Sequence, residues 1–409
     1  MLGPLRSLKI LDFTRLLPGP LATNLLCRLG ANVVKVDGKG AGSDYVRHIA
    51  PLLDFSDSSD GGRKKRHGAL YENLNAGKRE IVLDIKHQEC KDIICKLIST
   101  YDIIIEGNRP GVFDKLGIGY DALSKINPRL IYCSLTGYGS TGPYKHKAGH
   151  DINYLANAGV LGLTKNSDSQ DPETHRPPVL GFQAADATGA LHAVIGILTA
   201  VIDRGANNTG QYIDVSLMES SMTLAMPTLA SILNSSPTPS GNIDSAFKPG
   251  MGMLDGGLPN YNIYETKDNK YVCVGSLEEH FWKSICTHTN RLDLVDCKDI
   301  SIVQSFFKSK TLQEWLTINE HLDVCLDKIF EPKEIMSHSQ HIDRKTIVTD
   351  KFGHKQIALG PRLPNYPVDV LPTAHRYGED TYTVLKEIGC IDSDIHNWHK
   401  KEIIFCSGL

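Results

Sequence analysis

A glycine-rich stretch at 137–154 carries the first residues whose types and order could do chemistry. Three glycines and one proline fall between Gly137 and Tyr144, and His150 then stands directly before Asp151. Apolar residues follow at helical spacing, so we expect a helix to begin here with Asp151 as its N-cap and free backbone N–H groups after it. A proton-transferring imidazole beside such an anion site suits enolate chemistry. A histidine that only hydrogen-bonds within its loop is the other interpretation of this pattern.

Asp186 is the second candidate, because it lies near the start of an otherwise apolar helix. The segment Leu191–Ile202 is apolar on nearly all sides, and we expect it to be a buried helix. An acidic side chain at this place is costly unless it caps the helix, is paired or takes part in chemistry. The small residues from Ala184 to Ala190 leave room for a ligand or a second backbone. Capping and catalysis both stay open for Asp186 from this segment alone.

The elements that would position these residues follow a β-α-β order. Leu8–Phe13 and Asn32–Asp37 are typical of strands, and Pro20–Leu29 is typical of a helix with Pro20 at its first position. The first turn contains two prolines, which remove backbone donors, and it lacks the G-x-G-x-x-G pattern, so the sequence argues against NAD binding there. Further strands are expected at Glu80–Ile85, Asp102–Ile105, Leu130–Ser134 and Gln211–Leu217. The repeated β-α order predicts a parallel sheet with right-handed crossovers.

Length and composition narrow the class of protein. The chain has 409 residues, of which 41% are hydrophobic and 22% charged, and its formal net charge is -3. The length exceeds one ordinary core, so we expect a globular chain of two domains. The charge gives no reason to expect nucleic acid as a partner, and no continuous apolar run is long enough for a membrane span. The ten cysteines form no C-x-x-C pair, which favours reduced intracellular thiols. The peroxisome, the mitochondrion and the cytoplasm all stay open as locations.

Composition also divides the chain. We expect residues 1–233 to form a large α/β domain, 234–260 to be a linker rich in proline, glycine and serine, and 261–337 to form a small domain. Residues 338–409 are expected to link back and return across the large domain. No cofactor and no metal site are expected, since the two histidines in the loop after residue 337 lack the further ligands that a metal needs.

With these segments placed, the chain resembles the family III CoA-transferase superfamily over nearly its whole length. The resemblance rests on the segments Asp12–Pro20, Gly30–Asp37, Asn75–Arg79, Asn108–Leu123, Asn127–Gly139, Ala148–Ala156, Met253–Tyr261 and Val274–Glu278. Within the superfamily, Gly149–Tyr154 points to the α-methylacyl-CoA racemases, because the transferases typically lack the histidine. The resemblance implies a large Rossmann-like parallel-sheet domain, a smaller α+β domain and an interlocked homodimer.

The resemblance also implies an activity, that of an isomerase in lipid metabolism. Such an enzyme interconverts the 2R and 2S forms of 2-methylacyl-CoA thioesters by a two-base proton transfer through an enolate. The two bases would be His150 and Asp186, and Glu278 would orient the histidine. In the family, the backbone N–H at the position of Asp151 holds the thioester oxygen. Glu279 stands beside Glu278, so which of the two faces His150 stays open, as does which base serves which enantiomer.

A second set of residues would hold CoA itself. By position, the resemblance implies the candidates Arg109, Lys78 and Arg79 for the phosphates, Ala76 beside the adenine, and Lys39 in place of an arginine that the family commonly has nearby. Arginine suits two-pronged contact with phosphate, and lysine suits contact as a point charge. The segment 42–71, which contains the basic run 63–67, is longer than in the racemases, and its role stays open.

Two other functions remain as alternatives. In a CoA-transferase, Asp186 would attack the thioester as a nucleophile and form an aspartyl anhydride, which moves CoA between carboxylic acids. A CoA-binding protein without activity is the third hypothesis, and the joint presence of His150, Asp186 and Glu278 argues against it. The acyl chain stays open between branched fatty acyl-CoA and sterol-side-chain CoA, since an apolar surface discriminates chain shape weakly.

Overall fold

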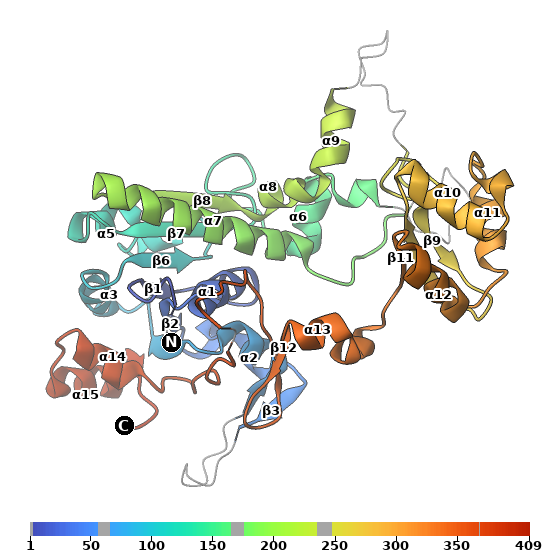
Figure 1. The fold of residues 1–409 in the computed structure, drawn as a ribbon. Helices are drawn as coiled ribbons and strands as arrows, with labels where there is room; N and C mark the ends of the chain where they lie inside the picture. Colours follow the sequence, from blue (N-terminus) through green and yellow to red (C-terminus); the bar gives the residue numbers. More distant parts are fainter. Residues whose placement is uncertain (1–2, 56–65, 165–175, 235–247, 368) are drawn as a thin grey trace. The chain divides into compact units, whose positions relative to one another are not determined.

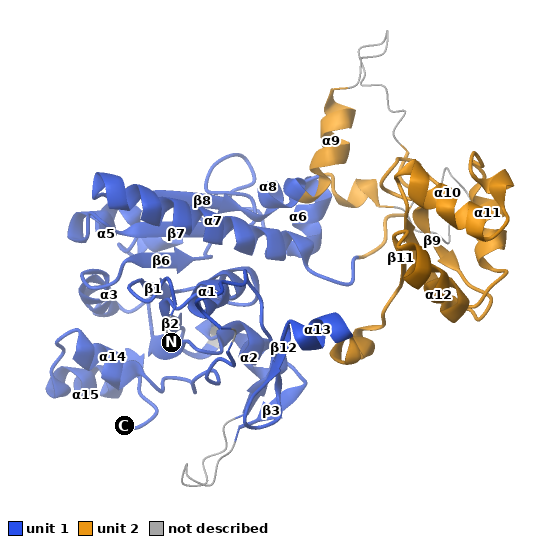
Figure 2. Cartoon of the chain, in the orientation of Figure 1, with its two compact units in different colours: residues 1–158, 180–223, 339–409 blue, residues 159–179, 224–338 orange. Residues whose placement is uncertain are grey.

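The computed structural model describes residues 3–55, 66–164, 176–234, 248–367 and 369–409 (Figure 1). The chain forms two compact units (Figure 2): unit 1 comprises residues 1–158, 180–223 and 339–409, and unit 2 comprises residues 159–179 and 224–338. Unit 2 therefore contains helix α9 (Met226–Leu233), which precedes the expected linker. Most of the basic run and much of that linker lie outside the described residues.

Unit 1 is built on a seven-stranded sheet in the order β14-β5-β2-β1-β6-β7-β8. Its strands are β1 (Lys9–Asp12), β2 (Asn32–Asp37), β5 (Arg79–Leu83), β6 (Ile103–Glu106), β7 (Ile131–Thr136), β8 (Tyr212–Ser216) and β14 (Ile404–Phe405). Neighbouring strands are parallel except β14, which runs antiparallel to β5. This confirms the predicted α/β class with a large parallel sheet. Two short antiparallel pairs accompany it, β3 (Leu52–Asp54) with β4 (Arg66–Gly68) and β12 (Ile347–Thr349) with β13 (Lys355–Ile357).

Unit 1 also contains helices, several of which pack against this sheet. They are α1 (Pro18–Arg28), α2 (Ala69–Asn75), α3 (Cys90–Ile98), α4 (Val112–Lys115), α5 (Tyr120–Ile126), α6 (Asp151–Asn157), α7 (Ala184–Asn207), α8 (Leu217–Ser221), α13 (Ser339–Asp343), α14 (Thr381–Glu387) and α15 (Asp392–Lys400). An aliphatic core joins the sheet to α3, α14 and α15. Strands that are buried on both faces consist largely of continuous apolar runs. For this reason apolar and polar residues hardly alternate along β6 and β7. Helix α1 begins at Pro18, two residues before the predicted start at Pro20, because a proline at the first position needs no N–H acceptor.

Helix α7 is less enclosed than its sequence suggests. It packs against α1, α8 and β7, and Figure 1 shows it beside α8 and β8. Ala193, Ile197 and similar residues are buried on that side. The opposite side is apolar yet open: Leu191 is 51% exposed, Ile195 60% and Ile202 78%. The prediction that this helix is buried on nearly all sides is therefore wrong. Among the described residues, α7 is also the one helix with the length and composition of a membrane span, although it carries Asp186 and packs on the sheet.

Unit 2 combines an antiparallel sheet with helices. The sheet contains β9 (Tyr261–Glu265), β10 (Tyr271–Gly275) and β11 (Leu326–Lys328), and the main helices are α10 (Glu279–His288), α11 (Ile300–Phe307) and α12 (Leu312–Leu322). Its core contains a cluster of aromatic side chains, with the ring of Trp315 against those of Phe306 and Phe307. This is the α+β arrangement expected of the smaller domain.

The chain after residue 339 belongs to unit 1 and covers the edge of its sheet. The N–H of Glu80 on β5 donates to Asp380 Oδ2 at 2.7 Å, and the N–H of Val82 donates to Thr381 Oγ1 at 3.1 Å. Strand β14 then pairs with the end of β5. The outer backbone groups of β5 are thus bonded by a segment some 300 residues later in the chain, which leaves this edge closed to other strands.

Candidate active site

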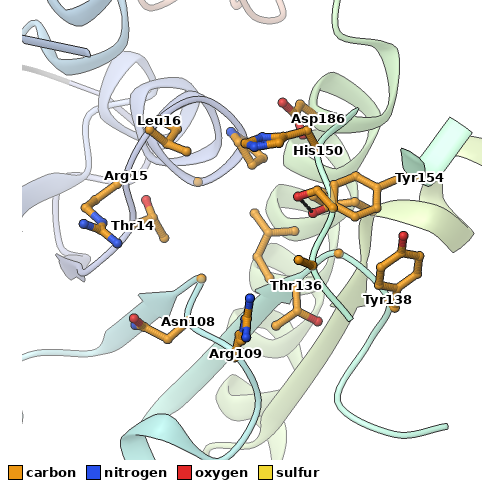
Figure 3. Close-up of a pocket in the computed structure, with 18 of the residues that line it drawn as sticks. Thr14, Arg15, Leu16, Asn108, Arg109, Thr136, Tyr138, His150, Tyr154 and Asp186 are labelled. Carbon is orange, nitrogen blue, oxygen red and sulfur yellow. Dashed lines mark hydrogen bonds between the residues drawn. The ribbon is translucent and has the colours of Figure 1, made fainter. Parts of the chain in front are cut away.

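A pocket of about 500 Å³ lies at the carboxyl ends of β1, β6 and β7 in unit 1. Ligands of open parallel sheets bind at this edge, because the loops that follow the strands gather there. The pocket lining includes His150, Asp151, Asp186 and Arg109, together with Arg15, Asn108, Thr136, Tyr138, Lys145, Lys147, Tyr154 and Leu217. Figure 3 shows His150 and Asp186 on one side of the view and Asn108 and Arg109 on the other. Four of the predicted site residues therefore share one pocket.

His150 is the N-cap of α6, so the predicted N-cap, Asp151, is the first residue inside the helix. The backbone of His150 is extended, with φ -125° and ψ 175°. Its N–H donates to Asn153 Oδ1 at 3.0 Å, and this bond from the helix's own first turn sets the boundary one residue earlier than predicted. The imidazole is exposed at the pocket. The histidine thus faces the pocket from the N-cap position of α6.

Tyr154 anchors the chain just before the histidine. Its hydroxyl donates to the backbone oxygen of Gly149 at 2.6 Å. A Cβ added at Gly137 would lie 2.4 Å from a carbon of this ring, and a Cβ added at Gly149 would lie 2.7 Å from it. Burial raises the pKa of Tyr154 to about 12, so the hydroxyl stays a donor at neutral pH. Two glycines of the motif are therefore explained by the ring that passes beside them.

Asp186 is the third residue of α7, and its carboxyl group is half-buried. Its backbone N–H donates to Asp151 Oδ1 at 3.0 Å. Burial raises the pKa of Asp186 to about 7, and the negative charge of Asp151 adds to the effect. Gln183 is the N-cap of this helix, and no described residue donates a hydrogen bond to the Asp186 carboxyl. The capping alternative therefore finds no support, and the group is left as a carboxyl that titrates near neutrality.

The backbone N–H groups at the start of α6 differ in their hydrogen bonds. The N–H groups of Asn153 and Tyr154 donate to the oxygen of His150, whereas no described acceptor lies within hydrogen-bond reach of the N–H of Asp151. The start of a helix also carries a partial positive charge. An oxygen that gains negative charge beside His150 would find a donor there.

Arg109 lies in the loop after β6, and a buried carboxylate holds that loop. Glu106 Oε2 accepts the N–H of Asn108 at 2.7 Å, and its Oε1 accepts the hydroxyl of Ser134 on β7 at 2.8 Å. Gly111 closes the loop with φ +84°, a left-handed conformation that favours glycine. The arginine is thus presented to the pocket from a loop that is fixed at both ends.

Three cationic side chains at the pocket were not predicted. Arg15 follows β1 and donates to the oxygen of Gly42 at 2.9 Å. Lys145 and Lys147 lie in the loop before His150, and the ammonium of Lys147 stands 4.1 Å from the ring centre of Tyr144. Their position between a strand's carboxyl end and a candidate base was the available signal. This signal is weak by itself, because most lysines in loops only face water.

Lys78 and Ala76 do not line this pocket, and their contact with CoA stays a prediction. Lys78 is buried, and its ammonium donates to Asp12 Oδ2 at 3.1 Å, to the oxygen of Pro20 at 3.0 Å and to Asn75 Oδ1 at 3.0 Å. An ammonium has three N–H donors, so none is left for a phosphate. Burial lowers the pKa of Lys78 to about 8. Ala76 is also fully buried. Both residues support the fold here.

Arg79 and Lys39 each form an ion pair instead of lining the pocket. Arg79 lies 2.6 Å from Glu387 Oε1, and Lys39 lies 2.5 Å from Glu402 Oε2. Both glutamates are more than half exposed, and pairs of this kind contribute little stability. The two cations are therefore engaged with the C-terminal segment of unit 1, and their contact with CoA stays a prediction.

Glu278 belongs to unit 2, where it is the N-cap residue of α10, and Glu279 is the first residue of that helix. Both side chains are exposed, and that of Glu278 makes no capping hydrogen bond. Its role beside the histidine stays a prediction. Across the described residues no group of three potential metal ligands occurs, and all ten cysteines are free thiols.

Comparison with known proteins places this chain in a family. Residues 5–381 match the family described as CoA-transferase family III. The chain is 29% identical to human (Homo sapiens) alpha-methylacyl-CoA racemase over 98% of this chain and 97% of that protein. It is 27% identical to mouse (Mus musculus) succinyl-CoA:glutarate CoA-transferase, over 99% and 90% of the two chains. The fold is similar to a CaiB/BaiF family protein from Brucella suis, with a TM-score of 0.77 and 24% identity over 94% of this chain and 99% of that one. The chain belongs to the CoA-transferase family III.

Proposed function

We propose that this enzyme is a racemase of 2-methylacyl-CoA thioesters in which His150 and Asp186 move a proton at the α-carbon. The observation that carries the proposal is their shared pocket, which joins an exposed imidazole to a carboxyl group with a pKa of about 7. A group that titrates near neutrality both accepts and donates protons readily. Racemisation requires this, since each residue acts as the base for one enantiomer and as the acid for the other.

The proposed reaction breaks and forms one C–H bond at the same carbon. The base takes the α-proton, and the electron pair moves onto the thioester oxygen to give an enolate. The α-proton is only weakly acidic, so this oxygen needs a prepared donor. The free N–H of Asp151 at the start of α6 would supply it. The protonated residue on the other side then returns a proton to the opposite face.

CoA would be anchored by the cations around the same pocket. Arg15, Arg109, Lys145 and Lys147 all line it, although the chain as a whole has a net charge of -3. Such a concentration of positive charge suits the diphosphate and the 3′-phosphate of CoA. Lys78 and Ala76 have no part in this proposal, because both are buried in the fold.

A CoA-transferase is the second candidate, and the names of several relatives favour it. In that reaction the Asp186 carboxylate attacks the thioester carbon, and only the ionised form is nucleophilic. A pKa of about 7 leaves the group about half protonated at neutral pH, which suits proton transfer better than nucleophilic attack. His150 would have no required role in that mechanism.

We also propose that the chain works as a homodimer. The exposed residues Leu191, Ile195 and Ile202 of α7 continue with Leu198 at alternating spacings of four, three and four residues. This is the spacing of an apolar seam that packs against another helix or surface. An open apolar stripe of this length on a core helix favours coverage by a second copy of the chain.

The decisive test is proton exchange in D₂O with a purified 2-methylacyl-CoA of one configuration. We expect wild-type protein to incorporate deuterium at the α-carbon and to give both enantiomers. His150→Ala should slow this by at least about 100-fold. His146→Ala is the matched control, since His146 is exposed in the same loop and does not line the pocket. Undiminished exchange in His150→Ala would refute the racemase. An acyl-enzyme trapped by hydroxylamine would support the transferase.

A further inference from the structure

The first turns of α6 and α7 are joined by one side chain, that of Asp151. Its Oδ1 accepts the backbone N–H of Asp186 at 3.0 Å, across 35 positions of sequence. An acidic residue at the start of a helix usually interacts with its own helix. Here it instead satisfies one of the four N–H groups that α7 leaves unpaired at its start. The backbone of the candidate base therefore depends on a residue of the neighbouring helix.

A neutral side chain would be sufficient for that hydrogen bond. The carboxylate also brings a negative charge close to the Asp186 carboxyl, and like charges at short range oppose ionisation of both groups. Asp151 has thus two separable effects on the same residue. One acts on the backbone through a hydrogen bond, and the other acts on the side chain through charge.

We propose that the side chain of Asp151 is a positioning residue for proton transfer: its hydrogen bond fixes the first turn of α7, and its charge favours a protonated carboxyl at Asp186. The effect on catalysis rests on the proposed function, whereas the effect on the titration of Asp186 does not. This role of the side chain is separate from that of the Asp151 backbone N–H, which would donate to the thioester oxygen. The raised pKa of Asp186, to which the charge of Asp151 contributes after burial, supports it.

The other groups around Asp186 leave Asp151 as the source of this charge. Helix α6 also provides Tyr154, whose pKa of about 12 keeps it neutral, and His150 at its N-cap. The first turn of α1, which packs on α7, carries no charged side chain. Helix α8 covers this part of α7 with Leu217 beside Gly189, and its acidic residue Glu219 is exposed. Strand β8 carries Asp214, which is exposed and accepts hydrogen bonds from Ser140. Asp151 is therefore the described anion that faces the start of α7 from these elements.

The test uses the full-length protein and measures the titration of Asp186 directly. Aspartate labelled with ¹³C at the carboxyl carbon gives an NMR titration, and Asp186→Asn assigns the signal. Asp151→Asn keeps an oxygen acceptor and removes the charge, whereas Asp151→Ala removes both. Asp121→Asn is the matched control, because Asp121 is an exposed acid in the first turn of α5 outside the pocket.

We expect Asp151→Asn to lower the pKa of Asp186 by about one pH unit. The acid limb of the exchange rate against pH should move by the same amount, and Asp121→Asn should change neither. Asp151→Ala should in addition speed hydrogen exchange at the amide of Asp186. Asp151→Ser, also uncharged and able to accept a hydrogen bond, replaces Asp151→Asn if that variant folds poorly. An unchanged titration of Asp186 in the uncharged variants would overturn the proposal. This readout needs no turnover, so failure of the racemase assignment is seen separately in the D₂O experiment.

Discussion

The carboxyl group of Asp186 costs stability at the pH where it would work. Its pKa is about 7 in the folded chain and about 3.9 in an unfolded one. Well below pH 4 the group is protonated in both states, so burial carries no penalty. As the pH rises towards 7, the Asp186 carboxyl ionises in the unfolded chain but stays largely protonated in the folded chain. The free energy of unfolding therefore falls.

We therefore predict that Asp186→Asn is more stable than wild type above pH 7, by about 2 kcal/mol after allowance for partial exposure. At pH 4 the two proteins should be nearly equal. Urea unfolding at pH 4, 6 and 8 measures the difference, and Asp121→Asn is the control for loss of an exposed acid. A difference that does not grow with pH would show that Asp186 is not held at a raised pKa.

Single substitutions can also test which of Glu278 and Glu279 faces His150. If Glu278 orients the catalytic histidine, Glu278→Gln should lower kcat by roughly 10–100-fold with little change in KM. Glu279→Gln, one position further along the same helix, should retain nearly full activity. Steady-state kinetics of the two variants compare them directly. Equal activities, or a loss in Glu279→Gln alone, would reject Glu278 in this role.

The sequence could name His150, Asp186 and Arg109 as pocket residues because each belongs to a motif at a predicted strand or helix end. It could not show that Lys78 points inward. That orientation depends on Asp12, whose buried carboxylate also accepts hydrogen bonds from the hydroxyls of Thr14 and Thr23. A lysine at the end of a strand has the same local sequence whether it binds a ligand or pairs with a buried carboxylate, because its partner here is 66 residues away.

Among the elements, the loop that delivers His150 depends on how closely the ring of Tyr154 packs. Gly137→Ala would place its Cβ 2.4 Å from that ring, and Gly137 has no positive φ that would strain alanine by itself. We predict a loss of about 2 kcal/mol in stability and a marked fall in activity. Gly181→Ala, where the Cβ would meet open space, should have little effect.

A double-mutant cycle tests the cause. In a Tyr154→Ala background the clash is absent, so Gly137→Ala should then cost little further stability. Urea unfolding of the four proteins gives the coupling free energy. If the two losses simply add, the glycine is required for a reason other than this ring.

Most strands and helices of unit 1 were predictable as elements, and their ends were less so. The strand Asn32–Asp37 is found where the pattern placed it, because it contains three valines, which favour strands, and is followed by a glycine. The starts of α1 and α6 differ by one or two residues, since a proline and the side chain of Asn153 decide them locally. The open face of α7 was not predictable, because apolar residues occur both in cores and at interfaces and the sequence does not distinguish the two.

For the whole molecule, the open stripe on α7 makes the oligomeric state testable. We predict that wild-type protein is a dimer by light scattering coupled to size exclusion. Ile195→Glu should shift it to monomer, because a charge in an apolar seam is left without solvation. Ile126→Glu is the matched control, since Ile126 is an exposed isoleucine at the end of α5, outside this stripe. A dimer unaffected by Ile195→Glu would place the contact on another surface.

The division of the chain was visible in composition only in part. Unit 2 begins at residue 224, ahead of the segment 234–260 that was expected to be the linker, and it also includes residues 159–179. No local signal could assign them, since domain membership is decided by contacts far apart in sequence. The same holds for β14, which is two residues long and too short for any periodicity.

The late closure of the sheet edge has a consequence for synthesis. Strand β5 leaves the ribosome with its outer backbone groups bare, and its cover at Asp380, Thr381 and β14 follows only after all of unit 2 has been made. At 5–20 residues per second, roughly 300 residues take on the order of 15–60 s. During that interval the nascent chain carries an unprotected β edge, so this protein should depend on chaperones more strongly than its finished fold suggests.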